Sequence, residues 1–331
     1  LSEASNTPVM MQVRIRACHV TGEFEARDNK RPEMTVREAL ESPRRDMTRV
    51  VLPPFSYVHE QEKVNKRLPA AQAFIRENGL NELFGPSAGK VGIVVQGGHY
   101  NGLIRGLQRL GLADLYGETE IPIYVLNVTY PLVDDEVLAF CENKEAVLIV
   151  EEGQPEFLET ALRAVLHKNG AKTQLLGKGM LPLAGELTGD VVMGGVEDFL
   201  REFAPQMLPD AVKSKNAPPI LRDDVLAQEV PIRPPSFCVG CPERPIFAAT
   251  KMVQQEKGQH HIAGDIGCHL FAINAPFDVA STTMGYGLGP ASASAFNDKA
   301  AGKRSISFMG DGGFWHNGLT SSIGNAVFND N

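Results

Sequence analysis

Short apolar runs alternate with stretches of helical periodicity between residues 90 and 203, and this alternation restricts the fold more than any other feature of the chain. Each run is apolar throughout, as in a strand buried on both faces of a sheet, and leucines recur at helical spacing after the first run. Strands separated by helices form parallel sheets covered on both faces. We therefore predict an α/β domain over 90–203, with strands at 91–95, 123–126 and 146–150 and helices at about 103–110, 134–141 and 156–167.

The segments on either side of this domain have different sequence patterns. Residues 8–16 end in an alternating pattern that predicts a strand, and the polar residues 22–47 predict a long surface loop with one short helix. Residues 204–235 are rich in proline and charged residues, and this composition is typical of an extended linker. The predicted organisation is a strand-and-loop segment 1–89, the α/β domain 90–203, a linker 204–235, and a second domain 236–331 with a strand at 306–309.

Composition excludes several classes of protein. The chain has 331 residues, 43% hydrophobic and 22% charged, which is enough apolar material for two ordinary domains. Its formal net charge of −8 argues against a general binder of nucleic acid or anionic membrane, because such surfaces attract clustered lysine and arginine. No apolar run approaches the roughly 20 residues that span a bilayer. We expect a soluble, cytoplasmic protein whose sequence, beginning with Leu1, starts inside a longer gene product or follows processing.

A glycine turn at residues 310–313 lies between the predicted strand 306–309 and the helix that follows it. Glycines let the backbone approach a diphosphate, and a helix N-terminus supplies N–H donors. Asp311 is placed to hold the Mg²⁺ that bridges such phosphates. The simpler interpretation is a tight turn whose aspartate only caps the helix, and the residues alone leave both interpretations open.

Three of the five cysteines have the spacing of metal ligands. Cys238 and Cys241 form a Cys-x-x-Cys pair, and Cys268 follows in a glycine-rich stretch. Thiolates at this spacing can share one metal centre, and a third thiolate from a glycine turn can close on them. Iron–sulfur ligation, a zinc site, a redox disulfide and inert buried thiols all stay open. The fourth ligand of a zinc site would come from His260, His261 or His269.

The order of four motifs resembles the large subunit of indolepyruvate ferredoxin oxidoreductases, which depend on thiamine diphosphate. The motifs are Cys-Val-Gly-Cys-Pro from Cys238, Gly-Asp-Ile-Gly-Cys from Gly264, Met-Gly-Tyr-Gly-Leu-Gly from Met284 and Gly-Asp-Gly-Gly-Phe-Trp-His from Gly310. Upstream, the stretches around Tyr130-Pro131-Leu132, Glu151-Glu152 and Leu181-Pro182 are similar to that family. The resemblance implies a parallel-sheet, transketolase-C-terminal-like α/β domain followed by an incomplete thiamine-diphosphate-binding α/β domain.

The resemblance also implies which residues contact cofactors. Thiamine diphosphate would be bound by Gly267, Met284, Gly285, Gly310, Asp311, Gly312 and His316. Asp311 would also hold Mg²⁺, while Cys238, Cys241 and Cys268 would bind a four-iron iron–sulfur cluster. His269 is a further candidate for contact with phosphate or substrate. We expect a helix-capping or interdomain role for Glu151 and Glu152, and packing in the core or at an interface for His19.

The chain departs from the family pattern in three respects. Val239 and Glu243 interrupt the family's Cys-Pro-Gly-Cys-Pro-His sequence, so the role of that histidine does not carry over. The family's N-terminal pyrimidine-binding domain is missing, which predicts that this fragment alone is inactive. In thiamine diphosphate enzymes an asparagine after the next strand completes the metal site. Because Asn329 and Asn331 directly follow the helix, neither is assigned to the metal.

The implied reaction is oxidative decarboxylation of a 2-oxoacid, such as indolepyruvate or another aryl pyruvate, to acyl-coenzyme A and CO₂, with electrons passed to ferredoxin. The implied partners are a small β- or γ-type subunit, ferredoxin and coenzyme A, in an oligomeric enzyme that binds neither nucleic acid nor membrane. Two alternatives stay open. One is a non-oxidative thiamine-diphosphate-dependent decarboxylase, and the other is a non-catalytic subunit whose fold is held together by a bound metal.

Overall fold

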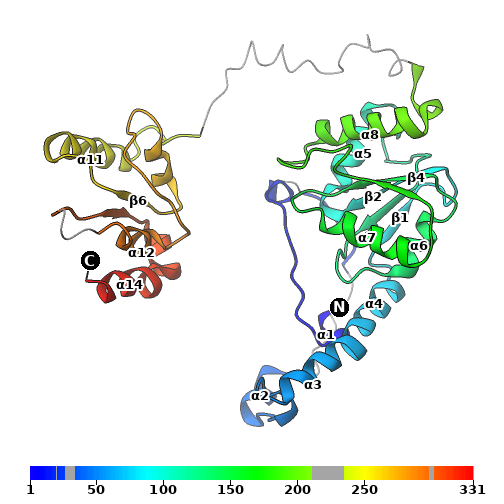
Figure 1. The fold of residues 1–331 in the computed structure, drawn as a ribbon, viewed down its shortest axis with the longest axis horizontal. Helices are drawn as coiled ribbons and strands as arrows, with labels where there is room; N and C mark the ends of the chain where they lie inside the picture. Colours follow the sequence, from blue (N-terminus) through cyan, green and yellow to red (C-terminus); the bar gives the residue numbers. More distant parts are fainter. Residues whose placement is uncertain (20, 27–33, 211–234, 298–301, 331) are drawn as a thin grey trace. The chain divides into compact units, whose positions relative to one another are not determined.

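The computed structural model describes residues 1–19, 21–26, 34–210, 235–297 and 302–330, and the chain divides into two compact units, Leu1–Ile220 and Leu221–Asn331 (Figure 1). We call them unit 1 and unit 2. Unit 1 contains a five-stranded sheet made of β1 (Glu82–Phe84), β2 (Val91–Gln96), β3 (Ile123–Leu126), β4 (Ala146–Val150) and β5 (Gln174–Leu176). The strand order is β1-β3-β2-β4-β5, with all strands parallel except β1, which pairs antiparallel at one edge.

Helices cover both faces of this sheet, as Figure 1 shows. One face carries α5 (Tyr100–Arg109) and α8 (Gly189–Phe203), and the other carries α6 (Asp134–Cys141) and α7 (Phe157–Lys168). Successive strand residues point to opposite faces, so Ile93 packs in one core cluster with Leu107, while Val94 packs in the other with Leu162. The apolar runs seen in the sequence are therefore strands buried on both faces, as predicted.

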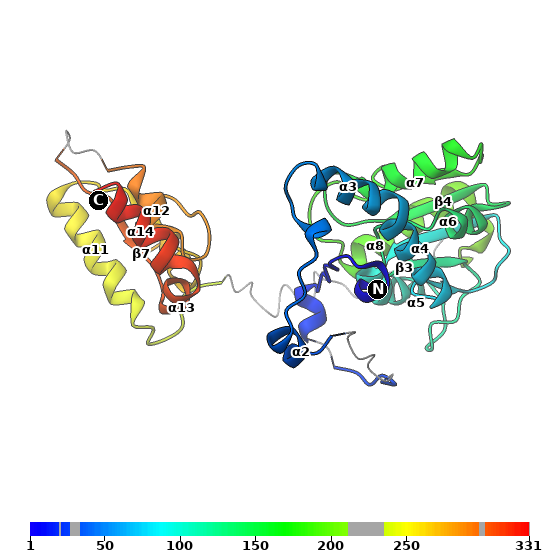
Figure 2. The same cartoon turned by 90° about the horizontal axis from the view of Figure 1, so that it is seen from below.

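The first part of unit 1 is mainly short helices that lead into one long helix. The helix from residue 55 to residue 77 joins α3 (Phe55–Glu62), the π-helical turn η3 (Lys63–Arg67) and α4 (Leu68–Glu77), and Figure 2 shows α3 and α4 from below. The remaining short helices of the unit are α1 (Ser2–Ser5), η1 (Ile15–His19), α2 (Val36–Glu41), η2 (Met47–Arg49), η4 (Gly97–His99) and η5 (Pro205–Met207). None of the helices in the described part combines the length and apolar composition that a bilayer crossing requires.

Three predictions about this part of the chain were wrong. Residues 8–16 contain no strand, and the apolar side chains of the alternating pattern are not buried, since Val13 and Ile15 are 62% and 77% exposed. The predicted division at residues 89 and 90 cuts β1 from its sheet, since Glu82 pairs with Val125. The predicted linker begins too early, because Ala204 and Leu208 belong to a core cluster of unit 1. Most of the rest of that linker, residues 211–234, lies outside the described residues.

Unit 2 is built on a small parallel sheet. Its strands are β6 (Ile262–Gly264) and β7 (Ile306–Phe308), paired from Ile262 to Ile306, and Thr282 forms a parallel bridge to Ala263 on the other side of β6. Figure 1 shows α11 (Glu243–Lys257) on one face of the sheet and α12 (Gly289–Ser294) on the other. After η6 (Cys268–Ile273) and β7, the unit ends in a continuous helix over residues 311–328, formed by α13 (Asp311–Gly313), η7 (Phe314–Ile323) and α14 (Gly324–Phe328).

Candidate functional site

Three glycine turns meet at the carboxyl edge of the unit 2 sheet. Residues 264–267 follow β6, residues 310–313 follow β7, and residues 285–289 follow the segment that bridges to β6 at Thr282. Parallel segments end at the same edge, so the three turns are neighbours even though they are far apart in sequence. We call this set of turns the glycine edge. It brings together Gly267, Gly285, Gly310 and Gly312 of the predicted site.

Asp265 lies where the three turns meet, and no role for it was predicted from the sequence. Its carboxylate is fully buried and accepts hydrogen bonds from the backbone N–H of Gly287, at 2.8 Å to either oxygen, and from that of Ile266 at 2.9 Å. A Cβ on Gly313 would lie 2.5 Å from the other side of the same carboxylate. A buried carboxylate needs such donors because burial removes its hydration. Asp265 is therefore the centre of the glycine edge.

Glycine is required at Gly287 by both conformation and space. Its φ of 80° lies in the left-handed region, and a Cβ there would lie 2.7 Å from the Gly313 carbonyl oxygen and 2.8 Å from the Gly318 nitrogen. The backbone of the 285–289 turn consequently packs directly on the helix over residues 311–328. Met284, predicted as a cofactor contact, stands beside this turn with 68% of its surface exposed.

The start of the 311–328 helix favours the interpretation of Asp311 as a metal ligand over its interpretation as a helix cap. Gly310 is the N-cap residue, so Asp311 is the first helical residue and not the cap. The Asp311 side chain is exposed at the positive end of the helix dipole. Mg²⁺ in phosphate sites commonly binds one or two carboxylates together with phosphate oxygens and water. The exposed Asp311 carboxylate, beside the first N–H groups of a helix, which have no acceptor within the helix, therefore fits a magnesium diphosphate.

Two histidines lie near this helix start, and they differ in burial. His269 is 6% exposed, and its Nε2 atom is buried without a hydrogen-bond partner among the described residues. A Cβ on Gly310 would lie 3.6 Å from Cε1 of its ring. His316 is exposed, with its ring centroid 5.3 Å from that of Tyr286. Both histidines thus border the glycine edge, and only His269 has an unsatisfied buried nitrogen.

The structure does not bring the three predicted cluster ligands together. Cys238 and Cys268 are exposed and Cys241 is partly buried, and the Cys241 N–H donates to the Cys238 carbonyl at 3.2 Å within one turn. Across the described parts of the chain, no group of three or more His, Cys, Asp or Glu is placed to hold a metal ion. The thiols as placed do not form a metal centre, and the iron–sulfur assignment stays a prediction.

Two of the histidines suggested for a zinc site are engaged elsewhere. His260 and His261 precede β6, whereas Cys268 follows it. The Nδ1 atom of His260 lies 2.9 Å from the Gly258 carbonyl, and Nε2 of His261 lies 3.0 Å from the Thr282 hydroxyl. Burial lowers the pKa of His261. These contacts do not favour zinc ligation by either ring.

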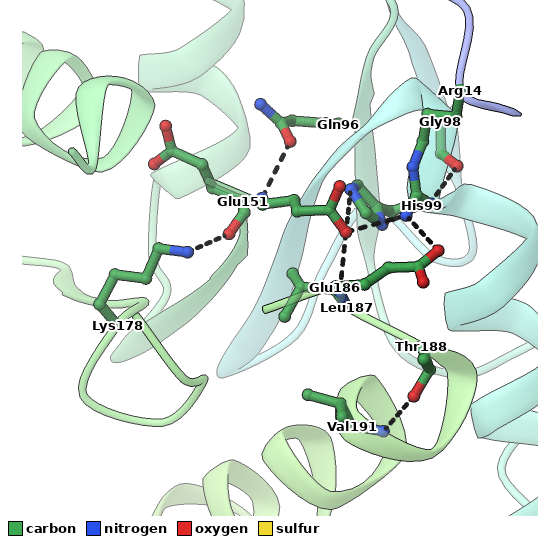
Figure 3. A network of polar contacts seen from close by, with 11 residues as sticks. Arg14, Gln96, Gly98, His99, Glu151, Lys178, Glu186, Leu187, Thr188 and Val191 are labelled. Carbon is green, nitrogen blue, oxygen red and sulfur yellow. Dashed lines mark hydrogen bonds and ion pairs between the residues drawn. The ribbon is translucent and has the colours of Figure 1, made fainter. Parts of the chain in front are cut away.

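A second polar cluster lies at the carboxyl ends of β2 and β4 in unit 1, and Figure 3 shows it from close by. Arg14 reaches it from the N-terminal segment and pairs with Glu152 at 2.8 Å and with Glu186 at 3.4 Å. The same guanidinium lies 3.1 Å from Nδ1 of the buried His99. Because arginine only donates, Nδ1 must accept and the ring proton is on Nε2. Burial and the Arg14 charge lower the pKa of His99.

The two glutamates that end β4 have structural partners. Glu151 is 5% exposed and accepts hydrogen bonds from the backbone N–H groups of Leu158 at 2.8 Å and Glu159 at 3.0 Å, at the start of α7. The expected helix-capping role is confirmed for Glu151. Glu152 accepts from the Leu187 N–H at 2.7 Å in addition to pairing with Arg14. His19, in η1, is exposed and does not pack in the core of unit 1.

Two family models match the chain. Residues 81–188 match a model described as an indolepyruvate oxidoreductase domain, and residues 265–330 match one described as the C-terminal TPP binding domain of thiamine pyrophosphate enzymes. The first covers the sheet of unit 1. The second begins at Asp265 and contains the turns at 285–289 and 310–313.

Curated relatives match nearly the whole chain. Indolepyruvate oxidoreductase subunit IorA of Methanothermobacter thermautotrophicus is 29% identical over 335 residues, covering 99% of this chain and 49% of the relative. The IorA subunits of Archaeoglobus fulgidus and Thermococcus kodakarensis are 28% and 25% identical, each covering 99% of this chain and 49% and 50% of the relative. The chain therefore spans about half the length of the curated relatives it matches.

Among solved structures, a 2-oxoglutarate:ferredoxin oxidoreductase from Magnetococcus marinus aligns with 45% of this chain and 24% of that chain. Its sequence identity of 16% and TM-score of 0.33 are too low for the likeness to bear on the fold. The relatedness rests on the sequence matches and the two domain assignments. Along nearly its whole length, the chain is thus a relative of the IorA subunits of indolepyruvate oxidoreductases, with an α/β fold and a thiamine pyrophosphate enzyme domain.

Proposed function

We propose that this chain supplies the diphosphate-binding half of a thiamine diphosphate site in a 2-oxoacid oxidoreductase. The observation that carries the proposal is the glycine edge, where Asp265 accepts hydrogen bonds from two backbone turns and lies against Gly313 of the third, beside the start of the 311–328 helix. Free N–H groups at a helix start, next to glycines without side chains, suit a diphosphate. The match of residues 265–330 to a TPP binding domain supports the same assignment.

The residues of this site differ in what they contribute to cofactor binding. Gly310 and Gly312 keep the phosphate-facing backbone clear of side chains, and Asp311 holds the Mg²⁺ that neutralises the phosphates. Gly267, Gly285, Met284 and His316 border the same site. Thiamine diphosphate, when bound, supplies the nucleophilic carbon and the electron sink for decarboxylation of a 2-oxoacid. The chain orients that cofactor through its diphosphate and leaves the aminopyrimidine end to another part of the enzyme.

The finer parts of the proposal follow from the relatives. We propose an aryl pyruvate such as indolepyruvate as substrate, coenzyme A as acyl acceptor, ferredoxin as electron acceptor, and a small partner subunit in an oligomeric enzyme. The names of the curated relatives support the substrate class. Iron–sulfur ligation by Cys238, Cys241 and Cys268 is proposed from their sequence spacing, and no electron path is derived through it. Iron and sulfide analysis of the anaerobically purified full-length enzyme tests it, because an iron-free enzyme that still decarboxylates 2-oxoacids would contradict it.

Direct titration tests the cofactor assignment. Thiamine diphosphate is titrated into the 331-residue chain with and without Mg²⁺, and binding is followed by calorimetry and by the fluorescence of Trp315, the one tryptophan of the sequence, which lies in the first turns of the 311–328 helix. We expect Mg²⁺-dependent binding. Asp311→Ala removes a carboxylate that the proposal places on the metal, so it should weaken this binding at least about 10-fold.

The matched control is Glu256→Ala, which removes the same charge from an exposed position of α11 in the same unit. It should leave the affinity unchanged. If the wild-type chain shows no Mg²⁺-dependent binding, or if Asp311→Ala binds as the control does, the glycine edge is not a magnesium diphosphate site and the proposed function fails.

A further inference from the structure

Nε2 of His269 is buried without a hydrogen-bond partner in the described part of the chain, and the position of the ring indicates which ligand it could bind. The residue is 6% exposed, and Nε2 makes no hydrogen bond to the described residues. A buried polar atom without a partner costs folding free energy, so such atoms are rare unless a ligand or water satisfies them. The ring lies on two of the three turns of the glycine edge, since hypothetical Cβ atoms on Gly267 and Gly310 would lie 2.7 and 3.6 Å from its Cε1.

Gly267 is the residue that lets the ring take this position. A Cβ at Gly267 would meet three atoms of the imidazole within 3.3 Å, so any side chain there would displace the ring from the edge. The Asp265 carboxylate fixes the 264–267 turn by accepting hydrogen bonds from the N–H groups of Ile266 and Gly287. His269 is consequently fixed by its surroundings, with an unsatisfied nitrogen beside the N-cap of a long helix.

We propose that His269 donates a hydrogen bond from Nε2 to an oxygen of the cofactor's diphosphate, and so adds a side-chain ligand to the backbone donors of the 311–328 helix. This inference rests on the proposed function. A neutral imidazole with its proton on Nε2 is a sufficient donor, so the contact does not depend on protonation of the ring. A hydrogen bond to a charged oxygen inside a nearly buried site is of the stronger kind.

The assignment separates two histidines that the sequence leaves equivalent. His316 is exposed beside Tyr286 and has water as an alternative partner. His269 has no such alternative at Nε2. We therefore assign the diphosphate contact to His269, while His316 remains a residue at the border of the site.

Substitution of His269 by leucine and by glutamine tests the proposal in the 331-residue chain. The leucine side chain is of similar size and has no donor, whereas the glutamine amide N–H reaches about as far as imidazole Nε2. With Mg²⁺ present, His269→Leu should weaken binding of thiamine diphosphate, and of inorganic pyrophosphate, by the same factor of about 10 to 100, as expected for a lost hydrogen bond to a charged group. His269→Gln should bind more tightly than His269→Leu.

A second measurement distinguishes a ligand from a structural side chain. Because Nε2 has no hydrogen-bond partner among the residues that the structure describes, His269→Leu should leave the thermal unfolding of the ligand-free chain unchanged or raise the unfolding temperature. The control His260→Leu makes the same change before β6, where Nδ1 of the ring lies 2.9 Å from the Gly258 carbonyl, and it should not alter pyrophosphate binding.

The outcomes separate this proposal from the proposed function. If the wild-type chain binds neither probe, the diphosphate site itself fails, and this inference falls with it. If the wild-type chain binds and His269→Leu binds equally well, only the role of His269 is refuted, and Nε2 then faces a buried water. Weaker binding of thiamine diphosphate with unchanged binding of pyrophosphate would place His269 on another part of the cofactor, which also overturns the proposal.

Discussion

Replacing the buried carboxylate of Asp265 by an amide should loosen the glycine edge by a predictable amount. One oxygen of Asp265 accepts from both Ile266 and Gly287, and the other accepts from Gly287 alone. In Asp265→Asn the amide oxygen can keep the first position, but the NH₂ group then faces the Gly287 N–H at about 2.8 Å, so two donors oppose each other. Losing one hydrogen bond to a charged acceptor and leaving a buried donor unpaired costs about 2 kcal/mol.

Hydrogen exchange followed by mass spectrometry measures this cost within each unit. A loss of about 2 kcal/mol corresponds to roughly 30-fold faster exchange for amides that exchange by opening of the site. The peptide containing Gly287 should show this increase, while peptides from β2 and β4 of unit 1 serve as internal standards. Asp278→Asn is the matched control, because Asp278 is exposed and its left-handed φ of 53° suits asparagine. If Asp265→Asn exchanges no faster than Asp278→Asn, the buried carboxylate does not hold the turns together.

Three further predictions concern unit 1. Glu151→Ala leaves two buried N–H groups at the start of α7 unpaired, so it should destabilise unit 1 by about 2–5 kcal/mol, measured by hydrogen exchange of α7 peptides. Burial and the Arg14 charge hold the pKa of His99 below its ordinary value, so stability should be highest above about pH 6.5 and fall as the pH drops toward the folded-state pKa, because the unfolded chain then binds the proton first. An NMR titration of the ring should show that low pKa, and Arg14→Ala should raise it. Burial raises the pKa of Cys141 to about 11, so iodoacetamide at pH 8 should alkylate the exposed Cys18 readily and leave Cys141 unmodified until the chain unfolds.

The three middle strands of the unit 1 sheet, β3, β2 and β4, could be predicted from the sequence because their signal is local, whereas the short edge strands β1 and β5 were not predicted. Each of the runs at 91–95, 123–126 and 146–150 is apolar at every position, and a strand buried on both faces needs that pattern whatever its neighbours are. The alternation at the end of 8–16 is also local, but a strand with one buried face needs a sheet to pack against. Without one, Met10 and Met11 stay exposed. Periodicity therefore predicted burial correctly only where the whole run was apolar.

The site could be predicted in part. The turns at 264–267, 285–289 and 310–313 are visible as glycine patterns, and their meeting at one edge follows from a parallel sheet. Asp265 was missed because its partners are backbone groups of a turn far along the chain, which no residue pattern records. An acidic residue inside an otherwise apolar and glycine-rich run was the available signal. The contact of Arg14 with Glu152 was missed for the same reason, since it joins positions far apart in sequence.

The parallel pairing of β6 with β7 has a consequence for folding. Ile262 meets Ile306 only after a long loop has closed, and the 285–289 turn lies inside that loop. Closing this loop costs chain entropy before the strand pairing can stabilise the unit, and such long-range pairing slows folding. The 310–313 turn cannot meet the other two before these strands pair, whereas the 264–267 and 285–289 turns can meet through the bridge between Ala263 and Thr282. We therefore expect the glycine edge to be completed late, when β7 pairs with β6, so that a partly folded unit 2 lacks the helix start that the proposed diphosphate site requires.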